Sequence, residues 1–321
     1  MYQEKNIALV LPAYNEAGSI GVVLDAIHGA EALRGLTIIV VDDGSTDQTA
    51  AIVRAKNTTL VQHARNKGLG LTFQTAVTYC LEHGFDAMVF FDADGQFEVQ
   101  DVPKVLQPLL DQRTDFVLGS RFLNGAPGDI PRMKLLGNHI LARFISWVTG
   151  TTVRDIACGF RAYSREALFR INISSRFTYT QEVLLDLLFK GLVMQEVPIS
   201  VRYFKDRHSH ISSNLWHYGW RVLKIMVRTI RDYQPMKFFG LIGAGIFFIG
   251  VTLDVWMLWF YFSTGSFSPY KIIGFGGAFL NLTGITIWFV GLVADMLNRI
   301  HRGQDEALYH QKKQLPKPLK Q

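Results

Sequence analysis

Residues 36–47 read LTIIVVDDGSTD, and residues 87–96 read AMVFFDADGQ. In both stretches a short run of apolar residues ends abruptly in two acidic residues and a glycine. An uninterrupted apolar run of this length is typical of a strand that is buried on both faces, as in a parallel sheet. We therefore interpret each stretch as a buried strand followed by a tight acidic turn.

The segments around these two strands alternate between strand and helix patterns. Further short strands are expected at 7–12, 59–62 and 116–119, and helical patterns lie at 20–32, 46–55 and 70–83. Ser45 or Thr46 is expected to cap the second of these helices. The alternation predicts an α/β domain with a mostly parallel, Rossmann-like sheet and flanking helices over roughly the first 200 residues.

Five acidic residues directly follow predicted strands: Glu16, Asp42, Asp43, Asp92 and Asp94. The carboxyl ends of parallel strands meet at one edge of the sheet, where open α/β sheets bind their ligands. Carboxylates crowded together repel one another unless a cation compensates them. The pair Asp92 and Asp94 therefore predicts a site for Mg²⁺ or Mn²⁺, ions that commonly bridge to phosphate oxygens.

Several other kinds of site find no support in the sequence. It contains no GxxxxGK[ST] phosphate loop, and Gly68-Leu69-Gly70 lacks the third glycine of a dinucleotide-binding pattern. It also contains no HExxH, GxSxG or CxxC motif. The sequence has two cysteines, Cys80 and Cys158, too few for a disulfide-stabilised fold of 321 residues, so we expect reduced thiols.

The net charge of +6 arises from one segment, residues 200–237, which holds eight basic and two acidic residues. Such a segment suits nucleic acid or anionic lipid. The residues that follow favour lipid, because apolar runs at 236–262 and 272–297 each exceed the about 20 residues that span a bilayer as helix. The alternative, a buried hairpin in a soluble protein, is disfavoured because buried globular helices are rarely this long.

Basic residues flank the outer ends of both apolar runs, whereas the connector between them holds only Lys271. The positive-inside rule therefore predicts an integral membrane protein whose N-terminal domain and both termini are cytoplasmic. Residues 214–233 combine apolar positions at helical spacing with basic residues, which is typical of an interfacial amphipathic helix. Residues 138–148 are a second candidate, and an ordinary packed helix is the alternative for both segments. Asp254 and Asp295 lie inside the runs, and their role stays open.

We thus expect four regions: a cytosolic domain at 1–212, an interfacial helix at 213–234, a transmembrane hairpin at 235–298 and a polar basic tail at 299–321.

Five short motifs follow one another along the first part of the chain: Pro12-Ala13-Tyr14-Asn15-Glu16, Asp42-Asp43-Gly44-Ser45-Thr46-Asp47, Asn66-Lys67-Gly68, Asp92-Ala93-Asp94-Gly95-Gln96 and Gly119-Ser120-Arg121-Phe122. Their order and spacing resemble those of the family 2 glycosyltransferases of the GT-A fold. Together with the hairpin, the chain most resembles dolichol-phosphate mannosyltransferases and bacterial polyprenyl-phosphate glycosyltransferases.

The resemblance implies a binding site for a GDP- or UDP-linked sugar, formed by Pro12, Ala13, Tyr14, Glu16, Val41, Asp43, Ala93 and Asp94. It implies that Asp92, Asp94 and Gln96 hold Mg²⁺ or Mn²⁺ and, through it, the diphosphate. It further implies an acceptor-side segment at 155–161 and an acidic helix position at Thr180-Gln181-Glu182. The residues expected to act in transfer are Asp94, Arg121, Asp155 and Arg207.

A lipid phosphate is mostly dianionic at neutral pH, because its second pKa is near 6. Such an acceptor needs no strong base but does need cationic groups, for which the candidates are Arg121, Arg132, Lys134 and Arg207. A sugar hydroxyl acceptor would instead need a carboxylate base, and Asp155 or Glu182 would then be the candidate. Relatives often carry Gly and then Ser-Lys after the arginine that matches Arg207, whereas this chain has His210, Ser212 and Ser213. Either Lys205 or His208 replaces the missing lysine, or the donor geometry differs.

Three functions therefore compete. A sugar transferase acting on polyprenyl phosphate uses every feature. A processive polysaccharide synthase usually carries a Gln-x-x-Arg-Trp motif, which does not occur in this sequence. A non-catalytic nucleotide-binding scaffold would need no complete set of Asp92, Asp94 and Gln96. The sequence favours the transferase and leaves self-association open.

Overall fold

The computed structural model describes residues 5–125, 132–172, 179–202 and 215–314. It divides into two compact units. The sheet unit comprises residues 1–218 and 308–321, and the hairpin unit comprises residues 219–307.

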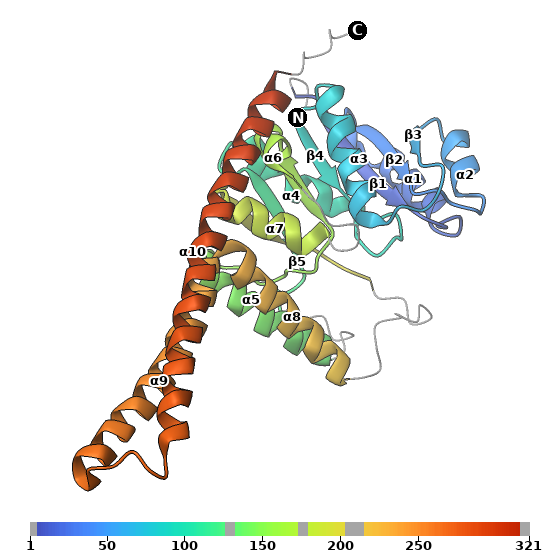
Figure 1. The fold of residues 1–321 in the computed structure, drawn as a ribbon. Coiled ribbons are helices and arrows are strands. Elements are labelled where there is room, and N and C mark those ends of the chain that lie inside the picture. Colours follow the sequence, from blue (N-terminus) through green and yellow to red (C-terminus); the bar gives the residue numbers. More distant parts are fainter. Residues whose placement is uncertain (1–4, 126–131, 173–178, 203–214, 315–321) are drawn as a thin grey trace. The chain divides into compact units, whose positions relative to one another are not determined.

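The sheet unit is built on one seven-stranded sheet with the order β3-β2-β1-β4-β6-β5-β7 (Figure 1). Its strands are β1 (Ile7–Ala13), β2 (Thr37–Asp42), β3 (Thr59–Gln62), β4 (Ala87–Phe90), β5 (Phe116–Ser120), β6 (Arg161–Ser164) and β7 (Met194–Pro198). Neighbouring strands pair in parallel except at β6, which is antiparallel to both β4 and β5. The prediction of a mostly parallel sheet with flanking helices is confirmed.

Seven α-helices lie between or beside these strands in the described sheet unit, together with short 3-10 helices at Glu31–Leu33 and Val99–Asp101. They are α1 (Ile20–Gly29), α2 (Thr49–Ala55), α3 (Leu69–Glu82), α4 (Val102–Leu110), α5 (Arg132–Thr149), α6 (Arg165–Arg170) and α7 (Tyr179–Phe189). The expected cap of α2 is wrong. The helix begins at Thr49 after Gln48, and the Ser45 hydroxyl donates to the Asp42 carboxylate instead.

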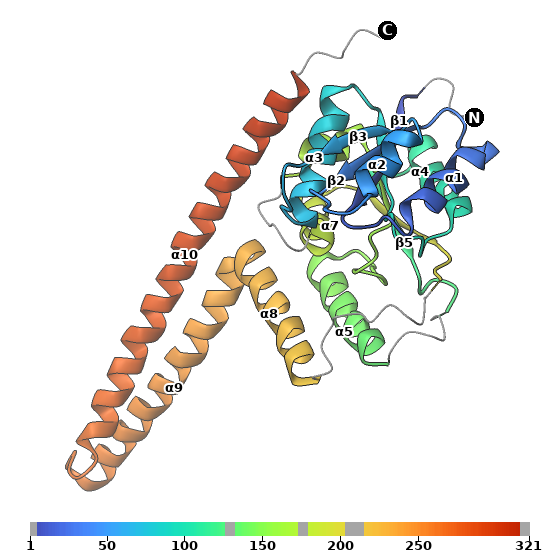
Figure 2. The same cartoon turned by 90° about the vertical axis from the view of Figure 1, so that its right-hand side faces the viewer.

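Helices lie on both faces of the sheet (Figure 2). Because side chains alternate along a strand, neighbouring residues of one strand pack against different helices. On β4, Val89 joins an apolar cluster that contains Val105 of α4. Its neighbour Phe90 lies on the other face, 5.0 Å from the ring of Phe73 on α3 and 5.3 Å from the ring of Tyr179 on α7. The sheet is therefore covered on both faces, which explains its nearly continuous apolar strands.

The reversed direction of β6 determines which residues reach the ligand-binding edge of the sheet. Arg161, the first residue of β6, is paired with Phe90 of β4 and with Leu118 of β5. The residues before Arg161 therefore lie where β4 and β5 end, and the Gly119 amide donates to the Phe160 carbonyl at 2.9 Å. Segment 155–160 is thus brought beside the acidic turn that follows β4.

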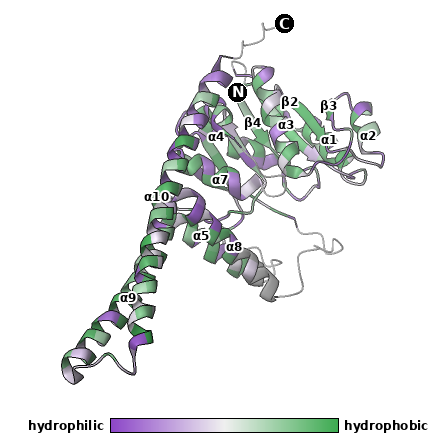
Figure 3. Ribbon diagram, in the orientation of Figure 1, coloured by the Kyte–Doolittle hydropathy of each residue, from purple (hydrophilic) through white to green (hydrophobic). Residues whose placement is uncertain are grey.

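The hairpin unit contains α9 (Pro235–Thr264) and most of α10 (Lys271–Lys313), and α8 (Leu215–Tyr233) precedes them. Both α9 and α10 are long and apolar enough to cross a membrane (Figure 3). Glycines let the two helices approach closely, since a Cβ atom at Gly243 would lie 2.7 Å from the Gly284 carbonyl oxygen. On α8, Trp220, Leu223 and Val227 recur at helical spacing and are exposed, as the amphipathic pattern predicted.

The last residues of α10 belong to the sheet unit. The Tyr309 side chain is buried and donates to Glu166 of α6 at 3.1 Å. The Lys312 ammonium donates to the Ile171 carbonyl, which follows α6, at 2.7 Å. The helix therefore continues well past residue 298, and its end packs on the sheet unit.

Candidate active site

The turns that follow β1 and β2 hold each other through hydrogen bonds. The Asn15 amide donates to the Ser45 hydroxyl at 2.9 Å, and the Asn15 side chain accepts from the Thr46 amide at 2.9 Å. The Glu16 amide donates to the Thr49 hydroxyl at 2.8 Å. Asn15 adopts a φ of 55°, a conformation that asparagine tolerates better than most residues. Two motifs that are about 30 residues apart in sequence thus form one surface.

Asp43 connects this surface to the turn that follows β3. Its buried carboxylate accepts hydrogen bonds from the Lys67 amide at 2.9 Å, from the Gly68 amide at 2.7 Å and from His63 Nδ1 at 2.8 Å. Gly44 packs against the same turn, because a Cβ atom there would lie 2.8 Å from the Asn66 nitrogen. Asp43, expected beside the nucleoside, therefore also organises the backbone around that position.

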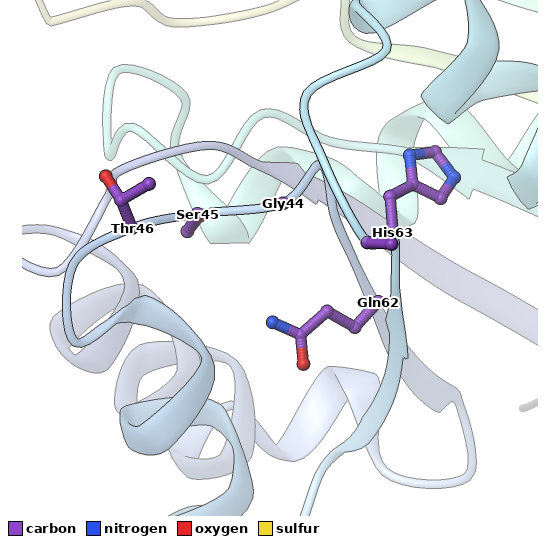
Figure 4. Close-up of a pocket in the computed structure, with 6 residues that line it drawn as sticks. Gly44, Ser45, Thr46, Gln62 and His63 are labelled. Atoms are coloured by element: carbon purple, nitrogen blue, oxygen red, sulfur yellow. The ribbon is translucent and has the colours of Figure 1, made fainter.

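A pocket opens beside these turns, at the ends of β2 and β3 (Figure 4). Its lining residues are Gly44, Ser45, Thr46, Gln62, His63 and Ala64. The Gln62 side chain extends between the two loops, whereas the His63 ring is turned away from Gln62 (Figure 4).

The turn after β4 carries the acidic pair. Asp92 and Asp94 are half-buried, and the Gln96 amide donates to the Asp94 carboxylate at 3.0 Å. Burial, together with the neighbouring carboxylates of Asp94 and Glu16, raises the pKa of Asp92 to about 7, whereas Arg161 and Arg121 lower it. The acids therefore lie close enough to oppose one another's ionisation, which is the condition that a bound cation relieves.

The donor set fits a hard divalent ion that is shared with a ligand. Among the residues that the structure describes, no three His, Cys, Asp or Glu side chains gather as a metal-binding group. Magnesium and manganese sites with one or two protein carboxylates complete their coordination with phosphate oxygens and water. Asp92, Asp94 and Gln96 match that kind of site better than a closed protein cage.

Arg121 and Asp155 form an ion pair beside the acidic turn. The guanidinium donates from Nε at 2.7 Å and from Nη2 at 2.8 Å to the two carboxylate oxygens, and the Arg121 amide adds a bond at 3.1 Å. The Asp155 side chain is fully buried, whereas that of Arg121 is 20% exposed. Two residues that were both expected to act in transfer are therefore paired with each other.

Arg161 was not among the residues predicted to act in the site. Its buried guanidinium donates to three carbonyl groups, at Cys158, Ile156 and Thr180. It therefore ties segment 156–158 to the start of α7. A single arginine inside the apolar stretch around residues 160–163 was the available signal, because a buried arginine needs several acceptors.

Gly159 brings this segment against the metal turn. A Cβ atom at Gly159 would lie 2.8 Å from Asp92 Oδ2 and 3.2 Å from the Tyr179 hydroxyl. Tyr179 is buried and donates to the Gly159 carbonyl at 3.3 Å, and burial raises its pKa well above the usual value. The backbone at Gly159 therefore limits where the Asp92 carboxylate can lie.

The remaining predicted site residues fall into three groups. Pro12, Ala13, Val41 and Ala93 are buried, so that side-chain contact with a ligand is restricted, whereas Tyr14 is 45% exposed. The side chains of Arg132 and Lys134 on α5 lie outside the described residues, as does all of Arg207. Glu182 lies in the first turn of α7.

Comparison with known proteins identifies the family and the fold. The family model "Glycosyl transferase family 2" matches residues 8–171, about half of the chain. A solved structure of glucosyl-3-phosphoglycerate synthase from Mycobacterium tuberculosis, with Mn²⁺ and uridine diphosphate, shares the fold. It aligns with a TM-score of 0.55 and 23% identity over 72% of this chain and 81% of its own.

Two curated relatives are named for lipid phosphate substrates or products. The UDP-N-acetylglucosamine–dolichyl-phosphate N-acetylglucosaminyltransferase of Methanococcus voltae is 31% identical over 62% of this chain and 87% of its own. The polyprenol monophosphomannose synthase of Mycolicibacterium smegmatis is 28% identical over 64% of this chain and 79% of its own. The motifs, the sheet and these matches agree: the chain belongs to glycosyl transferase family 2.

Proposed function

We propose that this protein transfers a sugar from a nucleotide-sugar donor to a polyprenyl phosphate, in an inverting, metal-dependent reaction at the cytoplasmic surface of a membrane. The observation that carries the proposal is the edge of the sheet at which Glu16, Asp43, Asp92 and Asp94 lie after β1, β2 and β4. The relatives' lipid phosphate substrates and the two apolar helices support the acceptor.

On this proposal the strand-end turns bind the donor. Tyr14 and the turn organised by Asp43 would border the nucleoside, and Asp92, Asp94 and Gln96 would hold Mg²⁺ or Mn²⁺ on the diphosphate. A divalent ion stabilises the charge of a leaving nucleoside diphosphate. The carboxylates alone would repel that diphosphate, so the donor side of the site requires the ion.

The acceptor would be held by cations. A phosphate dianion is already nucleophilic, so the chain has to bring two anions together rather than remove a proton. The Asp155 carboxylate fixes the orientation of the Arg121 guanidinium through two hydrogen bonds. Arg132, Lys134 and Arg207 complete the proposed set. The buried position of Asp155 and its two bonds to Arg121 favour a positioning role for this carboxylate over that of a general base.

The experiment is transfer by the purified full-length protein in neutral detergent. Undecaprenyl phosphate and dolichyl phosphate are each incubated with Mn²⁺ or Mg²⁺ and a panel of radiolabelled UDP- and GDP-sugars. Label that moves into the organic phase only when lipid phosphate is present supports the proposal. Transfer to free or polymeric sugar hydroxyls instead would indicate a polysaccharide-type enzyme, and nucleotide binding without any transfer would indicate a scaffold.

The metal assignment has its own test. Asp94→Asn should remove most turnover while the thermal midpoint stays within a few degrees, and EDTA should abolish activity reversibly. Full activity in excess chelator would contradict the assignment. Truncation tests the membrane part: removal of residues after about 213 should slow transfer to long-chain lipid more than to a short soluble analogue. Because it also removes the end of α10 that contacts α6, the thermal midpoint and nucleotide affinity of the truncated protein are measured alongside.

A further inference from the structure

His63 lies at the end of β3, on the side of the donor turns that the proposed chemistry leaves without an assigned function. It is 7% exposed, and its backbone amide continues the ladder between β2 and β3 by donating to the Asp42 carbonyl at 2.9 Å. Both of its ring nitrogens are engaged, Nδ1 with Asp43 at 2.8 Å and Nε2 with the Thr75 hydroxyl at 2.9 Å. The ring therefore links β2 to α3.

The direction of these bonds follows from the partners. A carboxylate only accepts hydrogen bonds, so Nδ1 carries a proton and donates to Asp43. In the neutral ring Nε2 is then an acceptor, and the Thr75 hydroxyl, which also lies 3.0 Å from the Leu71 carbonyl, can donate to it. His63 is thus held at both ends, and it offers Asp43 a donor of fixed position.

That donor determines how the Asp43 carboxylate is turned. One oxygen accepts from His63 and from the Lys67 amide, and the other accepts from the Gly68 amide, where α3 begins with a φ of 91°. Without the ring, the first oxygen would keep only a backbone partner and the carboxylate could rotate. The turn at residues 66–68 and the Gly44 backbone packed on it would then no longer be held in one fixed arrangement.

We propose that His63 is a positioning residue for the nucleotide part of the donor: through Asp43 it holds the turns after β2 and β3 in the arrangement that binds a nucleoside diphosphate. The inference rests on the proposed function, because it assumes that these turns face the nucleotide. His63 contributes to the lining of the pocket, but Figure 4 shows its ring turned away from Gln62, and both ring nitrogens are engaged by Asp43 and Thr75, so we assign its effect to the contact with Asp43.

Two nearly isosteric variants separate the two ring nitrogens. The side-chain amide of asparagine in His63→Asn can reach the position of Nδ1, whereas that of glutamine in His63→Gln reaches the position of Nε2 and leaves Asp43 without its donor. We expect His63→Asn to keep the dissociation constant for UDP or GDP, whichever the wild type binds in the presence of Mn²⁺, within about threefold. We expect His63→Gln to weaken it about tenfold or more. Isothermal titration calorimetry on the full-length protein measures both.

Kinetics and stability distinguish positioning from a general structural effect. In His63→Gln the KM for the donor should rise by the same factor, while kcat and the KM for the lipid acceptor change less than twofold. Thermal midpoints of the two variants should agree within a few degrees. Thr75→Val removes the Nε2 partner but keeps the Nδ1 contact, so it should weaken nucleotide binding less than fivefold.

Equal affinities of His63→Asn and His63→Gln would overturn the inference, and so would a loss in His63→Gln that Thr75→Val reproduces in full. If the wild type binds a nucleoside diphosphate but transfers no sugar to polyprenyl phosphate, the proposed acceptor is wrong. The affinities of the His63 variants then still test whether His63 positions the nucleotide-binding turns. If the wild type binds neither nucleotide, the proposed function and this inference fail together.

Discussion

Removing the charge of Asp155 is the most informative single change, because the structure gives this carboxylate one dominant partner. Asp155→Asn keeps the size of the side chain but leaves the Arg121 guanidinium facing an amide that accepts through only one oxygen. Breaking a fully buried pair costs about 3–5 kcal/mol. Arg121 is 20% exposed, so water can partly replace the lost partner, and we expect about 3 kcal/mol.

For a unit of this size, about 3 kcal/mol corresponds to a fall of roughly 6–12 °C in thermal midpoint, which differential scanning fluorimetry resolves. Arg121→Gln should cost at least as much, because it leaves the fully buried Asp155 carboxylate charged, with the backbone amide of residue 121 as its remaining donor from that residue. The double variant should be no less stable than Asp155→Asn, since both changes remove the same interaction.

Activity supplies the second readout. If Asp155 serves to orient Arg121, both single variants and the double variant should lose kcat/KM to a similar extent. A shift below 2 °C for Asp155→Asn would refute the view of a buried pair. A loss of activity in Asp155→Asn more than 100-fold beyond that of Arg121→Gln would show that the carboxylate takes part in the chemistry itself, as a hydroxyl acceptor would require.

Three further predictions follow from the site and its support. The pKa of Asp92 is raised to about 7, so below that pH a metal ion has to displace a proton from this carboxyl group. The apparent affinity for Mn²⁺ should therefore rise up to tenfold per pH unit from pH 5 to 7 and level off above pH 7. An affinity that calorimetry finds independent of pH would contradict this. Gly159→Ala should lower kcat/KM at least tenfold, because the new Cβ meets the Asp92 carboxylate, whereas Gly29→Ala, with open space around it, should leave kcat/KM unchanged. Tyr309→Ala removes roughly 2–3 kcal/mol of packing and should lower the thermal midpoint by about 4–12 °C. The neighbouring Leu308 is 44% exposed, so Leu308→Ala should shift the midpoint by less than 2 °C. Similar shifts for the two variants would mean that the end of α10 does not pack against α6.

The parallel strands and their acidic turns were predictable from the sequence because local signals agree. The buried strands β2 and β4 are uninterrupted apolar runs, and each ends at a pair of acids, so both the strand and the ligand edge follow from composition and order. The two apolar helices were predictable for the same reason, since length and hydropathy are properties of the segment itself. Strand bounds agree with the expected ones to within about two residues.

The helix α2 shows where local signals compete. Ser45 and Thr46 are both good cap residues, yet Ser45 is used by Asp42 and Asn15, and the helix begins three residues after Thr46. A cap residue that has a stronger tertiary partner does not cap. Local propensity therefore predicted the helix but not its first residue.

What the sequence by itself determined is the acidic turns that follow the parallel strands and the apolar character of the C-terminal helices, because these depend on neighbours along the chain. What only the tertiary structure decided is how partners distant in sequence meet. The antiparallel insertion of β6 brings residues 155–160 under the Asp92 turn, pairs Asp155 with Arg121 and buries Arg161 among carbonyl groups. His63 and Asp43 meet because β2 and β3 are neighbours in register. Hydrogen-bond and charge partners depend on distances of about 3 Å in space, and no periodicity along a sequence encodes those distances.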